Sequence, residues 1–60
     1  MIRQITVGKR YLFRGHVVTV ITKETGPRGW RPDMVTVRRL DDGSETKHLA
    51  RHFRDEADLV

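Results

Sequence analysis

The chain contains no cysteine among its 60 residues, and this absence limits how so short a fold can be stabilised. Without thiols there is no disulfide and no zinc site built on thiolates. A domain of this size buries only about 60 % of the surface that its unfolded chain exposes, so we expect marginal stability. Self-association remains open as a further source of stability, and a chain without cysteine fits the cytoplasm.

Long apolar runs are missing as well. The longest, Val17 to Ile21, is interrupted by Thr19, whereas a membrane-spanning helix needs about 20 apolar residues. The opening segment, residues 1–6, lacks the apolar centre of a secretory signal. We therefore expect a soluble cytoplasmic protein that has no membrane partner.

Motifs of enzymes and of metal sites are also absent. The chain has no phosphate-binding glycine loop, no serine-centred elbow and no His-Glu-x-x-His sequence. Asp41 and Asp42 precede a glycine in a predicted turn, which explains this pair of carboxylates without catalysis. His48 and His52 have the spacing of metal ligands on a helix, but two imidazoles alone make a poor site. We expect no catalytic residue, no metal and no cofactor, although a symmetric oligomer could build a pocket at its axis.

What the chain does contain is a strong pattern of strands. Residues 11–13, 16–22 and 34–40 are rich in β-branched and aromatic side chains and are bounded by Gly, Pro or Asp. Apolar residues occur on both faces of 16–22, as in a strand that bends across a barrel. A polar edge strand is predicted at 44–49, and residues 49–53 could form a single 3₁₀ or α turn. The predicted core consists of Tyr11, Phe13, Val18, Val20, Val35, Val37, Leu49 and Phe53.

Glycines mark the predicted turns. Arg14-Gly15 predicts a tight turn after the first strand, and Asp42-Gly43 predicts a type I′ hairpin. Residues 23–33 contain two Gly and two Pro without periodicity, which predicts one long loop. Residues 1–6 form an extended lead-in, and the acidic tail, 55–60, could form a last short strand or fray. The whole chain is thus predicted to be one all-β domain, a small five-stranded antiparallel barrel or a strongly bent sheet.

Three segments resemble the SH3-like small barrels of the Tudor and KOW kind. Residues 7–20 resemble their opening hairpin, with a Gly-led strand, a turn that carries Gly and a long curved second strand. Residues 35–44 resemble their central hairpin, and residues 49–53 resemble the short 3₁₀ turn that often precedes their last strand. The resemblance extends over residues 7–55 and implies an SH3-like barrel, and it implies the fold more than any one function.

Arginine dominates the charge of the chain. Twelve basic residues oppose eight acidic ones, for a net charge of +4, and nine of the twelve are Arg. Three of the acidic residues lie in the tail, so residues 1–54 carry twelve positive and five negative charges. Arg binds phosphate bidentately and stacks on flat rings, so this balance favours a nucleic-acid or acidic protein partner. A charge that only keeps a small domain soluble would give the same composition.

The candidate binding residues are a loop motif and a set of strand arginines. In the loop, Trp30 could stack on an unpaired base while Arg28 and Arg31 hold phosphates. Trp30 could equally cap an open barrel end or anchor a protein interface. Neighbouring strand residues face opposite ways, so only one of Arg38 and Arg39 can join a given basic face. The predicted strand residues of the site are Arg10, Arg14, Arg38 and Arg39.

These features together predict binding rather than catalysis. The first hypothesis is a small basic module for DNA or RNA, with little base readout and a steep dependence on salt. It requires that the candidate arginines converge on one surface, namely Arg10, Arg14, Arg28, Arg31 and either Arg38 or Arg39. The second is a protein-interaction module, which could be self-associating, and it predicts an exposed apolar patch around Trp30 and Met34 or an unpaired strand edge. An oligomeric enzyme is the third hypothesis.

Overall fold

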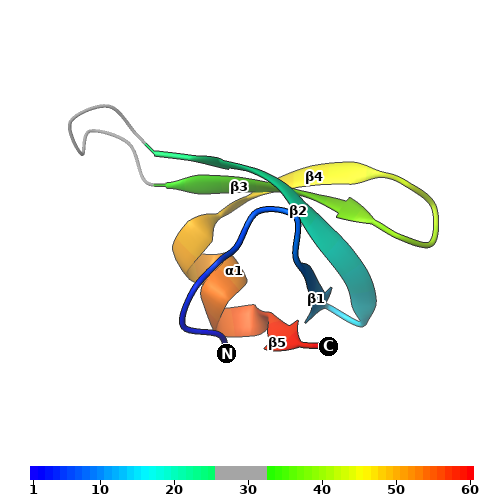
Figure 1. Cartoon of the computed structure of the whole chain (residues 1–60), viewed down its shortest axis with the longest axis horizontal. Coiled ribbons are helices and arrows are strands. Elements are labelled where there is room, and N and C mark those ends of the chain that lie inside the picture. Colours follow the sequence, from blue (N-terminus) through cyan, green and yellow to red (C-terminus); the bar gives the residue numbers. More distant parts are fainter. Residues whose placement is uncertain (26–32) are drawn as a thin grey trace.

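The computed structural model describes residues 1–25 and 33–60. These residues form one five-stranded antiparallel sheet with the strand order β4-β3-β2-β1-β5 (Figure 1). The elements in chain order are β1 (Arg10–Phe13), β2 (His16–Glu24), β3 (Met34–Arg39), β4 (Glu45–Leu49), α1 (Ala50–Glu56) and β5 (Asp58–Leu59). A mainly-β fold of five antiparallel strands with one short helical segment is therefore confirmed.

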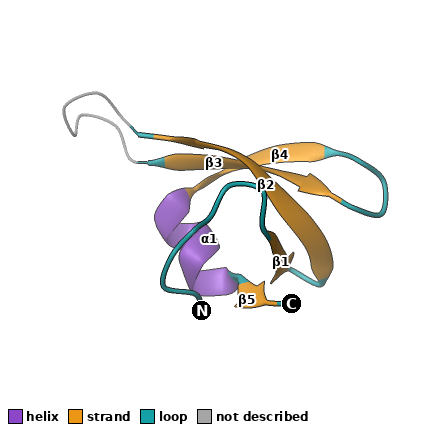
Figure 2. Cartoon of the chain, viewed as in Figure 1, coloured by secondary structure: helices purple, strands orange, loops and turns teal. Residues whose placement is uncertain are grey.

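Strand β2 bends the sheet. Its pairing with β3 shifts register between Val20 and Thr22, and a bulge of this kind bends a strand and increases its twist. The bend places β3 and β4 across from β1 and β5, with α1 beside the space between them (Figure 2). Residues 16–22, which carry apolar residues on both faces, lie in this bent strand.

The core lies on the concave face of the bent sheet. Seven of the eight predicted core residues are buried, and the exception is Leu49, which is half-buried at the end of β4. Leu49 pairs with Met34 on the outward-facing side of the alternation, so its inward prediction was wrong. The core also contains four residues outside the predicted set, which are Ile2, Ile5, Ala50 and Ala57.

Aromatic contacts join the sheet to the helix. The rings of Tyr11 and Phe53 meet edge to face at 5.6 Å between centroids, and Phe13 lies 4.8 Å from Phe53. Such pairs add about 0.5–1.5 kcal/mol each beyond the area that they bury. Phe53 thus attaches α1 to β1 on the concave side.

The two predicted turns differ in outcome. Arg14 and Gly15 both have positive φ, 52° and 81°, as a two-residue type I′ connection requires, so the tight turn is confirmed. In the β3–β4 connection only Gly43 has positive φ, and the Arg39 N–H donates to the Ser44 carbonyl across a four-residue loop. The type I′ prediction was wrong there because Asp42 accepts a hydrogen bond from the Ser44 N–H, which favours a different turn.

The C-terminal segment is more regular than the predicted single turn. Helix α1 has seven residues, Ala57 is buried after it, and β5 pairs with β1 through Tyr11 and Leu12. Of the two alternatives for the tail, the structure has the short strand. No helix of the described residues is long and apolar enough to cross a membrane.

Candidate functional site

The predicted site residues divide into three groups in the structure. The loop residues Arg28, Trp30 and Arg31 lie outside the described residues. The other four occupy opposite sides of the sheet, because the side chains of a strand alternate. Arg10 and Arg38 lie on the convex face, whereas Arg14 and Arg39 lie at the rim of the concave face.

On the convex face the sheet register creates a row of four residues. Arg10 is opposite Thr19, Thr19 is opposite Arg38, and Arg38 is opposite Glu45. The Nε and Nη2 atoms of Arg38 both donate to Glu45 Oε2, at 2.9 and 2.6 Å. Arg10 has no ion pair among the described residues, so it is the free cation of this row.

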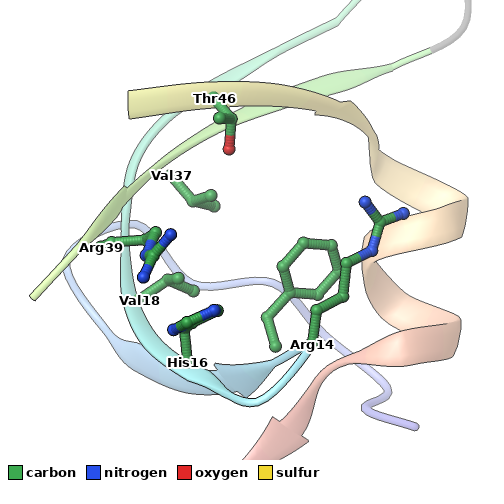
Figure 3. A pocket seen from close by; sticks show the side chains of 7 residues that line it. Arg14, His16, Val18, Val37, Arg39 and Thr46 are labelled. Atoms are coloured by element: carbon green, nitrogen blue, oxygen red, sulfur yellow. The ribbon is translucent and has the colours of Figure 1, made fainter. Parts of the chain in front are cut away.

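On the concave face a pocket of about 170 Å³ opens between the first hairpin and β3–β4. Val18 and Val37 form its apolar floor, and Thr46 lies on β4 above them (Figure 3). Arg39 and His16 stand at one side of the pocket and Arg14 at the other (Figure 3).

Arg14 is neutralised by the helix. Its Nε and Nη2 atoms donate to the two carboxylate oxygens of Glu56, at 2.9 and 3.0 Å. Hydrogen bonding to Glu56, and the attraction of its charge, raise the pKa of Arg14, while the same contacts lower the pKa of Glu56. The guanidinium also lies 4.9 Å from the centre of the Phe13 ring, so Arg14 covers this aromatic edge.

Arg39 is neutralised by the β3–β4 loop. Its Nε and Nη2 atoms donate to both oxygens of Asp41, at 3.0 and 2.6 Å, and Asp42 lies 3.7 Å from Nη1. Hydrogen bonds from Arg39 are the largest cause that lowers the pKa of Asp41 to about 2. His16 Nδ1 lies 3.2 Å from the same carboxylate. On this side of the pocket, two basic residues, Arg39 and His16, therefore lie beside two carboxylates, those of Asp41 and Asp42.

His48 completes the concave rim. It hydrogen-bonds Thr46 through Nε2 at 2.7 Å and packs against Phe13 at 4.8 Å between ring centroids. Burial, followed by the positive charge of Arg14, lowers the pKa of His48. His48 belongs to β4 and His52 to α1, so the two do not share a helix, and the described residues contain no group of three metal-ligating side chains.

Among the described residues, more basic than acidic side chains lie outside the ion pairs. Within residues 1–25 and 33–60, six basic side chains have no carboxylate within ion-pair distance, against two carboxylates that lack a basic partner. The two carboxylates are Asp33 and Asp55. The six basic residues are Arg3, Lys9, Arg10, Lys23, Arg51 and Arg54. Among the described residues, the excess charge is thus carried mainly by residues outside the predicted site.

Sequence reasoning missed the N-terminal part of this set. Residues 1–6 were expected only to lead into the sheet, yet Arg3 lines a groove of about 380 Å³ together with Lys9. The available signal was the doublet Lys9-Arg10 directly after Gly8, together with a third basic residue six positions earlier. Arg3 and Lys9 share a surface only because the N-terminal segment folds back onto the domain, and a local sequence pattern does not predict this.

A small apolar stripe also lies on the convex face. Leu12 pairs with Val17, and the Leu40 N–H donates to the Val17 carbonyl at 3.0 Å. Leu12 and Leu40 are 42 % and 48 % exposed. Three neighbouring apolar residues therefore face solvent beside the charged row.

Comparison of the chain with protein-family models, with curated proteins and with solved structures found no match. The function is therefore inferred from the geometry and charges of the site.

Proposed function

We propose that the protein is a small non-enzymatic module that binds nucleic acid through its backbone phosphates. The observation that supports this most is that, within residues 1–25 and 33–60, six basic side chains but only two carboxylates lack an ion pair. Arg28 and Arg31 add two more positive charges in residues 26–32, which include no acidic residue. Unpaired cations release condensed counterions when they meet phosphates, which is the main source of non-specific affinity.

Binding of this kind carries little sequence information. Contacts to phosphate position a protein on the polymer, whereas base edges supply specificity. Trp30, between two basic residues and next to Gly29, supplies a ring on which an unpaired base could stack. The proposal therefore favours single-stranded DNA or RNA, with Trp30 as the contact to bases.

The proposal is tested by titration of short single-stranded and duplex oligonucleotides at about 50 and about 200 mM salt, with Trp30 fluorescence as the readout. We expect micromolar binding that weakens steeply with salt and changes the fluorescence. Absence of binding at the lower salt would contradict the proposal.

The convex row offers matched variants. Arg10→Gln removes an unpaired charge and should weaken binding, whereas Arg38→Gln removes a charge that Glu45 already neutralises and should matter less. Glu45→Gln frees Arg38 and should tighten binding. Equal effects of Arg10→Gln and Arg38→Gln would show that ion pairing does not select the contact residues.

For the fold we propose a closed SH3-like barrel of the Tudor or KOW kind. The long bent β2, and a helical segment directly before the last strand, support this likeness. Closure requires that the outer edge of β4 be covered. Slow hydrogen exchange of the β4 amides that do not pair with β3 would support closure, and fast exchange would contradict it.

A second candidate function is protein interaction through the apolar stripe of Leu12, Val17 and Leu40. Exposed apolar patches mark such surfaces, although this one is small. Sedimentation of the wild type and of Leu12→Thr/Leu40→Thr tests self-association. A dimer that the double variant abolishes would favour this candidate, and a monomer at all concentrations would leave only a foreign protein as partner.

A further inference from the structure

The groove beside the N-terminal segment differs from the pocket of Figure 3 in its charge. Arg3 and Lys9 line the groove with Gln4 and Thr6, and none of its lining residues is acidic. In the pocket, by contrast, both arginines are bound to carboxylates of neighbouring segments. The groove is therefore a concave place on the described surface where two basic side chains are available to a ligand.

The backbone that carries the groove is fixed at both ends. The Ile2 N–H donates to the Arg54 carbonyl of α1 at 3.0 Å, and the Gly8 N–H donates to the Val20 carbonyl of β2 at 2.7 Å. Ile2 and Ile5 are buried, at 7 % and 4 % exposure. Because the segment is pinned to both the helix and the sheet, the positions of its basic residues are set before a ligand arrives.

The buried Tyr11 hydroxyl fixes the middle of the segment. It accepts a hydrogen bond from the Thr6 N–H at 2.9 Å and donates to the Gln4 carbonyl at 3.3 Å. The Lys9 N–H then donates to the Thr6 carbonyl at 3.2 Å, which closes a turn through Gly8 at φ 87°. Lys9 Nζ lies 5.8 Å from the Tyr11 ring centre, so its position also depends on this tyrosine.

The size and composition of the groove suit a phosphate that is part of a chain. A water takes about 30 Å³, so about 380 Å³ has room for a phosphate and its remaining waters. Arg supplies a bidentate donor and Lys a point charge, and Gln4 and Thr6 add an amide and a hydroxyl. Met1 and Leu59, at 81 % and 66 % exposure, provide apolar surface at the groove that a sugar could contact.

We propose that Arg3 and Lys9 hold one backbone phosphate of a bound polynucleotide in this groove. The inference rests on the proposed nucleic-acid binding and assigns it a specific contact. Arg10 follows Lys9 directly and lies on the neighbouring convex face. The sugar–phosphate backbone of the bound polynucleotide would therefore run from the groove toward β1. The contact is to the phosphate alone, so it does not discriminate between bases.

The test compares three variants in the binding of a labelled oligothymidylate to the full chain. Arg3→Gln/Lys9→Gln removes both basic side-chain charges of the groove, and Arg3→Lys/Lys9→Arg keeps them. The N-terminal ammonium of Met1, which also lines the groove, stays bound to Asp58 in every variant. Arg51→Gln removes an unpaired charge that lies on α1 and does not line the groove. All the substituted side chains are exposed, so we expect unchanged circular dichroism and melting within a few degrees.

The proposal predicts about tenfold weaker binding or more for Arg3→Gln/Lys9→Gln at low salt. The slope of log K against log salt should become shallower by about 0.7, because one phosphate contact is lost and each such contact on a single strand contributes about 0.7. The charge-keeping variant should bind like the wild type, and Arg51→Gln should lose much less.

Two results would contradict the phosphate contact assigned to the groove and leave the proposed function in place. One is wild-type affinity and slope for Arg3→Gln/Lys9→Gln. The other is an equal loss per charge for Arg51→Gln, which would mean that net charge alone matters. Absence of oligonucleotide binding by the wild type would instead overturn the proposed function, and the groove's assignment would fall with it.

Discussion

Arg14 and Glu56 connect the two ends of the fold through a bidentate ion pair. They are 42 residues apart in sequence, and their nitrogen and oxygen atoms lie 2.9 and 3.0 Å apart. Arg14 lies in the β1–β2 turn and Glu56 is the last residue of α1. The pair therefore joins the first hairpin to the C-terminal helix, and it places a negative charge beside that of Arg14.

This pair should contribute modestly to stability. Both groups are partly exposed, at 57 % and 42 % of the side chain, so water screens the attraction. Arg14→Gln and Glu56→Gln are each expected to lower Tm by about 5 °C or less. A double-mutant cycle of urea unfolding measures the coupling, and additive effects of the two substitutions would contradict a direct stabilising contact.

Acid should destabilise the fold through its paired carboxylates. The pKa of Asp41 is about 2 in the folded state against an ordinary 3.8, and hydrogen bonds also lower those of Asp42 and Glu56. The unfolded chain therefore binds more protons as the pH falls, so stability present above about pH 4 is lost toward pH 2. Urea midpoints along this range measure the loss. In Asp41→Asn the loss should be smaller, and an unchanged profile in that variant would contradict the assignment.

His48 should add a second pH dependence nearer neutrality. Burial lowers its pKa below the ordinary 6.5, so the unfolded chain takes up its proton first as the pH falls. Stability is therefore complete above about pH 6.5 and declines as the pH falls from there toward the folded pKa. An NMR titration of the His48 ring should give a pKa below 6.5. Urea midpoints of His48→Gln should change less between pH 8 and 5 than those of the wild type, and an equal change would contradict the prediction.

Substitution of Gly43 should lower the stability of the fold only through the conformation of the backbone. Its φ is 75°, and a methyl group built on it would contact nothing within 4 Å. Gly43→Ala is thus expected to cost about 1 kcal/mol, because only the left-handed backbone is disfavoured. Gly43→Asn should cost less, since Asn tolerates this region. Urea unfolding with a constant m-value measures both, and a larger cost for Asn would contradict the explanation.

The sequence predicted the strands because alternation is local. Tyr11 with Phe13, and Val35 with Val37, are buried as their period of two indicates. The N-terminal segment could not be predicted in this way. Its two isoleucines form no run, and the segment is held by a hydrogen bond from the Ile2 N–H to the carbonyl of Arg54 in α1, far away in the sequence.

The candidate site was less predictable than the fold for the same reason. The sequence shows which residues are basic, but the available charge depends on which of them meet a carboxylate. Arg14 and Arg39 meet theirs in the tail and in the β3–β4 loop. Arg10 does not, although all three belong to the same predicted set.

The buried N-terminal segment leads to the sharpest stability prediction. Ile5 is 4 % exposed in the core, whereas Val7, two residues later in the same segment, is 54 % exposed. Ile5→Ala should therefore cost about 2–4 kcal/mol, because it leaves a cavity that the pinned backbone cannot close. This cost is a large share of the free energy of unfolding, which is roughly 3–9 kcal/mol for a domain of this size.

Val7→Ala is the matched control for Ile5→Ala. It removes a side chain of similar chemistry from the exposed side of the segment, so it should change stability by about 0.5 kcal/mol or less. Urea unfolding followed by far-UV circular dichroism measures both variants. If Ile5→Ala were as stable as Val7→Ala, the segment would not belong to the core. The groove between Arg3 and Lys9 would then lack the fixed backbone on which its phosphate contact depends.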